Sequence, residues 1–127
     1  MFLSAVEVPA NGGERPYFPR KQVETVKEIM KYMTEHLEKH FTLEELSAKF
    51  HIPLTSMKNC FKGIYGSSIY AFMRSYRIQA AALMIRGNKD SITAIAGKVG
   101  YNNPSKFSAA FKEITGLTPA KYQKKFV

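Results

Sequence analysis

Polar and basic side chains recur on one face of two predicted helices, and their chemistry suits contact with a polyanion. If the apolar residues of each helix point inward, the opposite face presents hydroxyls, amides and ammonium groups. Lysine can approach guanine O6 and N7 or a phosphate, and an asparagine can pair with adenine through two hydrogen bonds. The candidate DNA-contacting residues are Thr55, Ser56, Lys58, Asn59 and Lys62 in one helix, and Ser105, Lys106, Ser108 and Lys112 in the other.

Further contacts are expected from the backbone and from other basic residues. The N–H groups at the two helix starts, around Thr55 and Ser105, are candidate phosphate anchors. For Arg77 we favour an ion-pair or capping role within the fold over a DNA contact. The other basic candidates, whose helix faces the sequence does not fix, are Arg74, Arg86, Lys89 and Lys98.

Charge is divided unevenly along the 127 residues. Residues 1–48 hold six Lys/Arg and eight Asp/Glu, a net charge of −2, whereas residues 49–127 hold thirteen Lys/Arg and two Asp/Glu, a net of +11. Basic charge confined to one part of a chain favours a surface that faces a polyanion, although a merely solubilising surface also fits.

The elements that must position these faces are helices, because no segment alternates at period two. An apolar stripe from Gln22 onward predicts the first helix, and Thr42 with Glu45 is the pattern of a capping box. Ser67 and Ser68 suit the start of a long helix that stops at Gly87-Asn88. Asp90 or Ser91 caps the next helix, and Asn102 or Asn103 precedes another at Pro104. The first stripe consists of Val23, Val26, Met30, Met33, Leu37 and Phe41.

The pattern contains an internal repeat. One set of residues recurs at an offset of fifty, and the helix before it recurs at forty-nine, so the second copy has one more residue in its turn. Each copy has helix-turn-helix spacing. Gly100 suits a turn with positive φ, and His51 occupies the matching place. The pairs are Met57/Phe107, Cys60/Ala110, Phe61/Phe111, Lys62/Lys112, Ile64/Ile114 and Gly66/Gly116, preceded by Leu43/Ile92, Leu46/Ile95 and Ser47/Ala96.

The sequence therefore predicts an all-α fold with two tandem helix-turn-helix subdomains and a long linker helix. The expected parts are a flexible leader or linker at 1–20, a first subdomain at 21–66, the linker helix at 67–87 and a second subdomain at 88–127. A joining helix over residues 69–86 is about 27 Å long. Two recognition helices at its ends suit successive major grooves, which are ~34 Å apart on one face of DNA.

The second copy carries a specific motif, Ile92-x-x-Ile95-Ala96-x-x-Val99-Gly100-Tyr101-x-x-x-Ser105-x-Phe107-x-x-x-Phe111-Lys112-x-x-x-Gly116-x-Thr118-Pro119-x-x-Tyr122. The first copy shares parts of it through Leu46, Met57, Phe61-Lys62, Gly66, Arg77 and Ala81. These residues resemble the signature of the AraC/XylS-type transcription regulators.

The resemblance covers roughly residues 22–126. It implies about seven helices and a DNA-binding domain fused to a separate effector-binding or dimerisation domain, for which residues before 20 leave no room. It also implies double-stranded DNA and RNA polymerase as partners.

Two departures from the family pattern bear on function. Asn59 and Ala109 stand where the family often has arginine, and an alanine cannot donate to a base or a phosphate. We therefore expect the first recognition helix to read bases and the second mainly to position the protein. Pro53 stands where a serine cap is common, which leaves that helix start without a hydroxyl cap.

Other function classes have little support in the sequence. No catalytic constellation, phosphate loop or cofactor motif is present, so neither enzyme activity nor a cofactor is expected. His36 and His40 have zinc-like spacing but no companion ligands, so no metal site is expected. Cys60 falls on an inward stripe and is expected to be a packed thiol.

The sequence also predicts a compartment and leaves one alternative function open. No apolar run reaches the ~18 residues that span a membrane, and a lone cysteine favours a reducing, cytoplasmic setting. The alternative to sequence-specific DNA binding is a protein-interaction module on the same helical scaffold, with weak or non-specific DNA binding.

Overall fold

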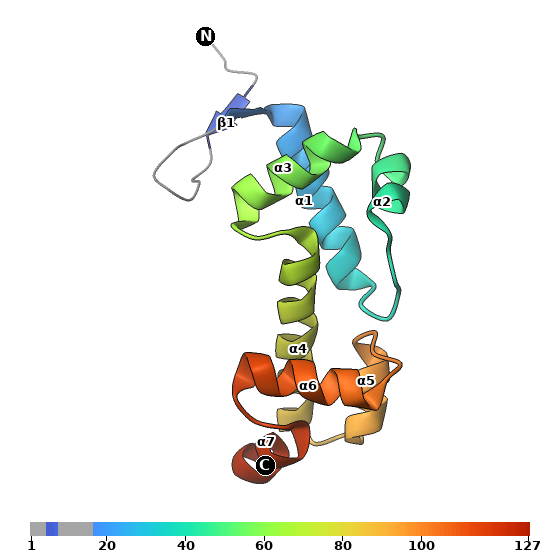
Figure 1. Ribbon diagram of the computed structural model, residues 1–127, viewed down its shortest axis with the longest axis vertical. Helices are drawn as coiled ribbons and strands as arrows, with labels where there is room; N and C mark the ends of the chain where they lie inside the picture. The colour runs from blue at the N-terminus through green and yellow to red at the C-terminus, as the bar shows by residue number, and fades with distance from the viewer. Residues whose placement is uncertain (1–4, 8–16) are drawn as a thin grey trace. The chain divides into compact units, whose positions relative to one another are not determined.

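The structure is a computed structural model that describes residues 5–7 and 17–127. Seven α-helices follow one another within these residues (Figure 1). They confirm the all-helical class, with the long helix α4 in the predicted place. The helices are α1 (Arg20–Glu35), α2 (Leu43–Lys49), α3 (Leu54–Tyr65), α4 (Ile69–Gly87), α5 (Ile92–Lys98), α6 (Pro104–Thr115) and α7 (Pro119–Phe126).

Two short strands precede the helices. Strand β1 (Ala5–Glu7) pairs antiparallel with β2 (Tyr17–Pro19), and Val6 lies opposite Phe18 in the register. The sequence predicts only a leader without regular elements here, because three-residue strands are too short to show alternation. Most of that predicted leader, residues 1–4 and 8–16, lies outside the described residues.

The helices group into two compact units. The first unit holds Met1–Glu35 and Phe41–Phe72, and the second holds His36–His40 and Met73–Val127. Helix α4 is unbroken from Ile69 to Gly87, so its first turn belongs to the first unit and the rest to the second.

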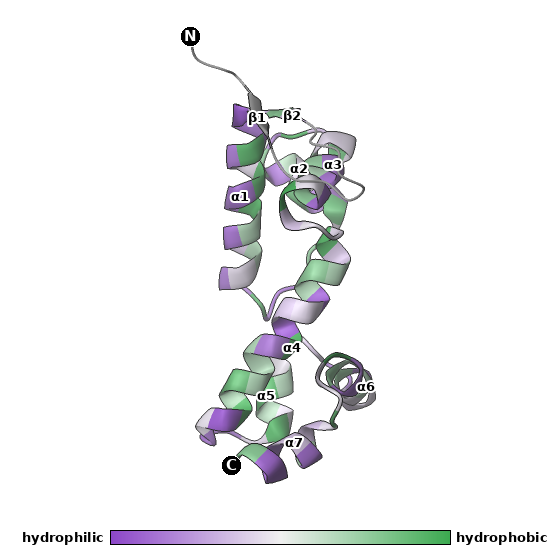
Figure 2. Cartoon of the chain, turned by 90° about the vertical axis from the view of Figure 1, so that its left-hand side faces the viewer, coloured by the Kyte–Doolittle hydropathy of each residue, from purple (hydrophilic) through white to green (hydrophobic). Residues whose placement is uncertain are grey.

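The first unit is built on α1 and α3. Figure 2 shows α1 with hydrophilic residues on its outer side and hydrophobic residues toward α3. Ile29 is fully buried, whereas Met30, which the predicted stripe placed inside, is only partly buried. Val23, Val26 and Met33 are buried as predicted, so only one member of the stripe within α1 differs, and the stripe keeps the three-and-four spacing of a helix face. The buried residues of α1 to α3 are Val23, Val26, Ile29, Met33, Leu46, Ile52, Met57, Cys60 and Phe61.

The ends of the helices follow the predicted caps. Thr42 and Glu45 form the capping box, with the Thr42 N–H donating to Glu45 Oε1 at 2.9 Å and the Glu45 N–H to Thr42 Oγ1 at 3.0 Å. Of the alternatives left open, Ser91 caps α5 and Asn103 caps α6. These contacts satisfy N–H groups that have no partner within the helix.

The second unit has a core rich in aromatic rings. Phe107 and Phe111 of α6 are fully buried with ring centroids 5.7 Å apart. Tyr122 of α7 meets Phe111 edge to face at 5.3 Å, so α7 is packed directly onto α6. From α4, α5 and the residue after α5 this core takes Ile78, Ala81, Ile85, Ile95, Ala96 and Val99.

Arg77 holds three backbone carbonyls in the second unit. Its Nη1 donates to the carbonyls of Leu37 and Val99, the latter at 2.9 Å, and its Nη2 donates to Lys39 at 3.1 Å. Gly100 has φ +94°, and a Cβ there would overlap the Leu37 carbonyl and the Arg77 guanidinium. The predicted capping role of Arg77 is therefore confirmed, and only glycine fits the adjoining turn without displacing these groups.

The internal repeat is confirmed in the helix bounds. Helices α2 and α5 have seven residues each at an offset of forty-nine, and α3 and α6 have twelve each at fifty. The turns match as well, because His51 has φ +54° where Gly100 has +94°.

The repeat also extends into a third helix, which the sequence analysis missed. Ser68 caps α4 and Thr118 caps α7, fifty residues later. Phe61 meets Phe72 edge to face at 5.5 Å, just as Phe111 meets Tyr122.

Candidate nucleic-acid interface

The outer face of α3 carries the predicted polar side chains. Opposite the buried Met57, Cys60 and Phe61, four of the five candidates are exposed and Ser56 is half-buried. The exposed ones are Thr55, Lys58, Asn59 and Lys62. The fold therefore brings two ammonium groups and one carboxamide to the surface of a single helix whose other side is fixed in the core.

Helix α6 presents the matching face in the second unit. Ser105, Lys106 and Lys112 are exposed, Ser108 is half-buried, and Ala109 is exposed among them. The position that matches Asn59 thus offers only a methyl group. Both faces are accessible as predicted, and the contact of each residue with DNA stays a prediction.

The two helix starts differ in the N–H groups they leave available. In α6 the side chain of Asn103 accepts from the N–H of Ser105 at 2.9 Å and of Lys106 at 3.1 Å. The prediction that free N–H groups around Ser105 anchor a phosphate is therefore wrong, because these donors already have an acceptor within the fold. Helix α3 begins after Pro53 with no side-chain cap, as predicted, so its first N–H groups stay uncapped by any side chain.

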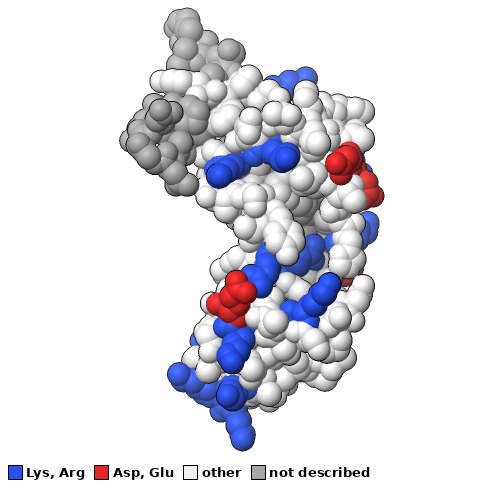
Figure 3. Space-filling model, viewed as in Figure 1, with Lys and Arg blue, Asp and Glu red and all other residues white. Residues whose placement is uncertain are grey.

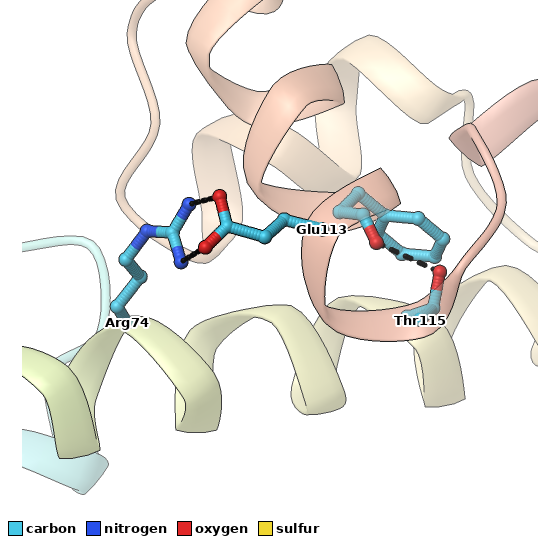
Figure 4. Close-up of polar contacts among 4 residues, drawn as sticks. Arg74, Glu113 and Thr115 are labelled. Atoms are coloured by element: carbon cyan, nitrogen blue, oxygen red, sulfur yellow. Dashed lines mark hydrogen bonds and ion pairs between the residues drawn. The ribbon is translucent and has the colours of Figure 1, made fainter.

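An ion pair fixes the last turn of α6 to α4. Arg74 Nη2 lies 3.1 Å from Glu113 Oε2, and Nη1 lies 3.4 Å from Oε1, so two parallel contacts join the groups (Figure 4). Nearby, Thr115 Oγ1 donates to the Phe111 carbonyl at 2.7 Å. Sequence reasoning missed Glu113 on this helix, since a charge thirty-nine residues away gives no periodic signal.

Two of the three remaining basic candidates also have partners within the second unit. Lys98 Nζ lies 2.7 Å from Asp90 Oδ2. Arg86 donates from Nε to the Tyr122 hydroxyl at 2.9 Å, and its guanidinium lies 4.6 Å from the Phe126 ring centroid. Lys89 is exposed. Lys98 and Arg86 are thus engaged within the unit, whereas Lys89 joins the lysines of α6 and α7 as an exposed cation.

Figure 3 shows where the charges gather. On the face in view, Lys and Arg side chains lie over α3 in the first unit, and over α6 and the α7 end in the second. Few acidic atoms interrupt the second group on this face. The second unit therefore combines a helix-turn-helix with a basic surface, which is the electrostatic footprint of nucleic-acid binding, and the first unit has basic side chains over α3.

The structure also bears on metal binding, on the thiol of Cys60 and on membrane-spanning helices. Among residues 5–7 and 17–127 no group of three or more His, Cys, Asp and Glu residues is arranged to hold a metal ion. Cys60 is fully buried, as predicted, and burial raises the pKa of its thiol to about 11. In the same residues, no helix has the length and apolar character needed to cross a membrane.

Comparison with known proteins identifies the family. A family model described as a helix-turn-helix domain matches residues 46–125, more than half of the chain. The chain therefore belongs to this helix-turn-helix family, and its domain is of the AraC type.

Among curated relatives, the chain is similar to the HTH-type transcriptional activator RhaR of Yersinia pseudotuberculosis. The two are 29% identical over 99 residues, which is 78% of this chain and 34% of that activator. The chain thus spans about a third of the length of the curated relatives it matches.

Two solved structures share the fold. The DNA-binding domain of the global transcriptional factor AdpA, solved in complex with a target DNA, has a TM-score of 0.76 at 22% identity. That match covers 80% of this chain and 92% of AdpA's domain. A regulator of the AraC type from Chromobacterium violaceum has a TM-score of 0.74 at 15% identity, with 85% and 96% of the two chains covered.

Proposed function

We propose that this chain binds double-stranded DNA sequence-specifically, as the DNA-binding part of an AraC-type transcription regulator. The observation that carries the proposal is the exposed polar face of a recognition helix built twice, at the same positions of two helix-turn-helix units. The AdpA domain with this fold was solved on a target DNA, which supports the same use of the fold here.

Within this proposal the two helices have different tasks. Asn59 reads a base through its carboxamide, while Lys58 and Lys62 contact guanine edges or phosphates. In α6 the exposed Ala109 makes no hydrogen bond, so Lys106 and Lys112 position the protein through phosphates. The remaining predicted contacts are Thr55, Ser56, Ser105 and Ser108. Loss of base contacts in the second unit is compatible with readout of DNA shape.

We further propose that the two recognition helices enter successive major grooves. Helix α4 has nineteen residues, which corresponds to about 28 Å at 1.5 Å per residue. The expected site therefore has two half-sites about 10 bp apart.

The proposed partners extend beyond DNA. Because the RhaR match covers only 34% of that activator, a fused effector-binding or dimerisation domain is one proposed partner and RNA polymerase is the other. The proposed compartment is the cytoplasm, where a bacterial regulator meets its DNA. No catalytic role is proposed.

Selection of bound sites from random duplex DNA tests the proposal. The expected result is an enriched motif with two half-sites and an affinity that falls steeply with salt, since log K drops by ~0.9 for each phosphate neutralised. Binding without an enriched motif, or without a salt slope, would favour the protein-interaction module instead.

Two single variants then test the division of labour. Asn59→Ala is expected to weaken binding to the selected site by about 1–3 kcal/mol and to leave a scrambled site almost unaffected. Lys106→Ala is expected to weaken both sites alike. Equal losses on both sites for Asn59→Ala would refute base reading by this residue.

A further inference from the structure

Helix α7 carries a basic stripe that the recognition faces do not include. Lys121, Lys124 and Lys125 are all exposed, and their spacing of three and four residues places them along one face of the helix. Pro119 and Tyr122 are buried on the other side. The three ammonium groups, named here the α7 stripe, therefore point away from the core of the second unit.

The stripe is held in a fixed place beside the recognition helix α6. Tyr122 packs edge to face against Phe111 of α6, and its hydroxyl accepts from Arg86 of α4. The Arg86 guanidinium also lies over the Phe126 ring, in the last turn of α7. Aromatic contacts thus join the helix that displays the stripe to α6 and α4 of the same unit.

No carboxylate side chain of residues 73–127 is available to neutralise the stripe. This segment contains two, Asp90 and Glu113, and each forms an ion pair elsewhere, with Lys98 and Arg74 respectively. Like charges at spacings of three and four destabilise a helix. An anion bound over the stripe would relieve that repulsion.

The first copy of the repeat has no equivalent stripe. At the offset of fifty that relates α7 to the start of α4, the matching residues are Ala71, Arg74 and Ser75. The only cation among them, Arg74, is paired with Glu113. The stripe is therefore specific to the second copy of the repeat, the one whose recognition helix has Ala109 in place of a hydrogen-bonding side chain.

We propose that the α7 stripe binds backbone phosphates of the DNA beside the base pairs that α6 faces. This rests on the proposed DNA-binding function and goes beyond it by adding a contact surface outside both recognition helices. The second unit is then anchored by charge, through α6 and α7 together, while Asn59 in the first unit reads sequence. Phosphate contacts fix position and carry no direct sequence information.

The test is a triple variant in the full chain, Lys121→Gln, Lys124→Gln and Lys125→Gln, on a duplex chosen by site selection. The expected result is a slope of log K against log salt that is shallower by up to ~2.7, since each phosphate contact contributes ~0.9. Selected and scrambled sites should weaken by the same factor. Hydroxyl-radical footprinting should lose protection only at the edge of the site beside the second half-site.

A matched control removes three exposed lysines from another helix, as Lys21→Gln, Lys27→Gln and Lys31→Gln in α1. A salt slope of the α7 variant equal to that of the α1 control overturns the proposal, because only net charge would then matter. A loss confined to the selected site overturns it too, since the stripe would be reading bases. If the unaltered chain selects no duplex, the proposed function itself is refuted. This result is obtained before either variant is made, so it is distinct from a failure of the α7 proposal.

Discussion

Substitution of Gly100 by alanine is predicted to damage the second unit far more than the same change at other glycines. Gly100 has φ +94°, and an added Cβ would overlap the carbonyl oxygen of Leu37 and lie 3.2 Å from Arg77 Cζ. Left-handed backbone alone costs an alanine about 1–2 kcal/mol. Forcing extra atoms into a packed site adds about 1–3 kcal/mol. The expected loss in free energy of unfolding is therefore roughly 2–5 kcal/mol.

Two other glycines separate these contributions. Gly116 has φ +88° with nothing within 4 Å of its added Cβ, so Gly116→Ala should show the backbone cost of about 1–2 kcal/mol alone. Gly97 lies within α5 with the same open space, and Gly97→Ala should stabilise the protein by about 0.5–1 kcal/mol. Urea unfolding followed by far-UV circular dichroism measures all three. Equal losses for the changes at Gly100 and Gly116 would refute the close approach of Arg77 and Leu37 to this turn.

Three further predictions follow from contacts already described. Arg77→Met should lower the free energy of unfolding by roughly 2–4 kcal/mol, because it leaves three carbonyls without their donor; the salt slope of DNA binding should stay unchanged, and a shallower slope would show that Arg77 contacts phosphate. Cys60 should resist Ellman's reagent at pH 8 until urea unfolds the chain, because its pKa of about 11 leaves little thiolate. Since that folded-state pKa is above the unfolded one, Cys60 should also make stability fall as the pH rises from about 8.5 toward 11; rapid labelling of the native protein would contradict both statements. Thr42→Ala should cost about 1 kcal/mol at pH 7, because it removes the hydroxyl that accepts from the Glu45 N–H. The backbone N–H of Thr42, which alanine keeps, and then the Thr42 side chain lower the pKa of Glu45, so only the side-chain part of this effect is removed and the cost should be slightly smaller at pH 3; an equal cost in urea titrations at both pH values would exclude a role for the contact between the Thr42 side chain and the carboxylate.

The sequence was most informative where the governing interactions are local. The capping box of Thr42 and Glu45 and the left-handed turn at Gly100 depend on residues close together in the chain. The two copies could be found because each repeats the same local pattern. Helix periodicity placed the polar faces of α3 and α6 on the outside, as the structure has them.

Contacts between segments that are distant in the chain could not be predicted from the sequence. Nothing in the spacing of Arg74 and Glu113 indicates that they pair, and the three carbonyl partners of Arg77 come from two separate stretches of backbone. The cap by Asn103 was one of two open alternatives, and its occupation of the Ser105 N–H was not foreseen. These details depend on tertiary packing, which short-range patterns do not encode.

The two turns, similar in backbone, are closed by different chemistry, and this limits how the copies can be exchanged. In the first unit, Ser47 Oγ donates to the Ile52 carbonyl at 2.5 Å, and the left-handed position tolerates an imidazole side chain. In the second, Ala96 has no hydroxyl and an arginine crowds the turn from outside. A chimera that carried residues 47–53 into the place of 96–103 would bring a histidine against that guanidinium. The two turns are therefore not interchangeable, although their backbones are similar.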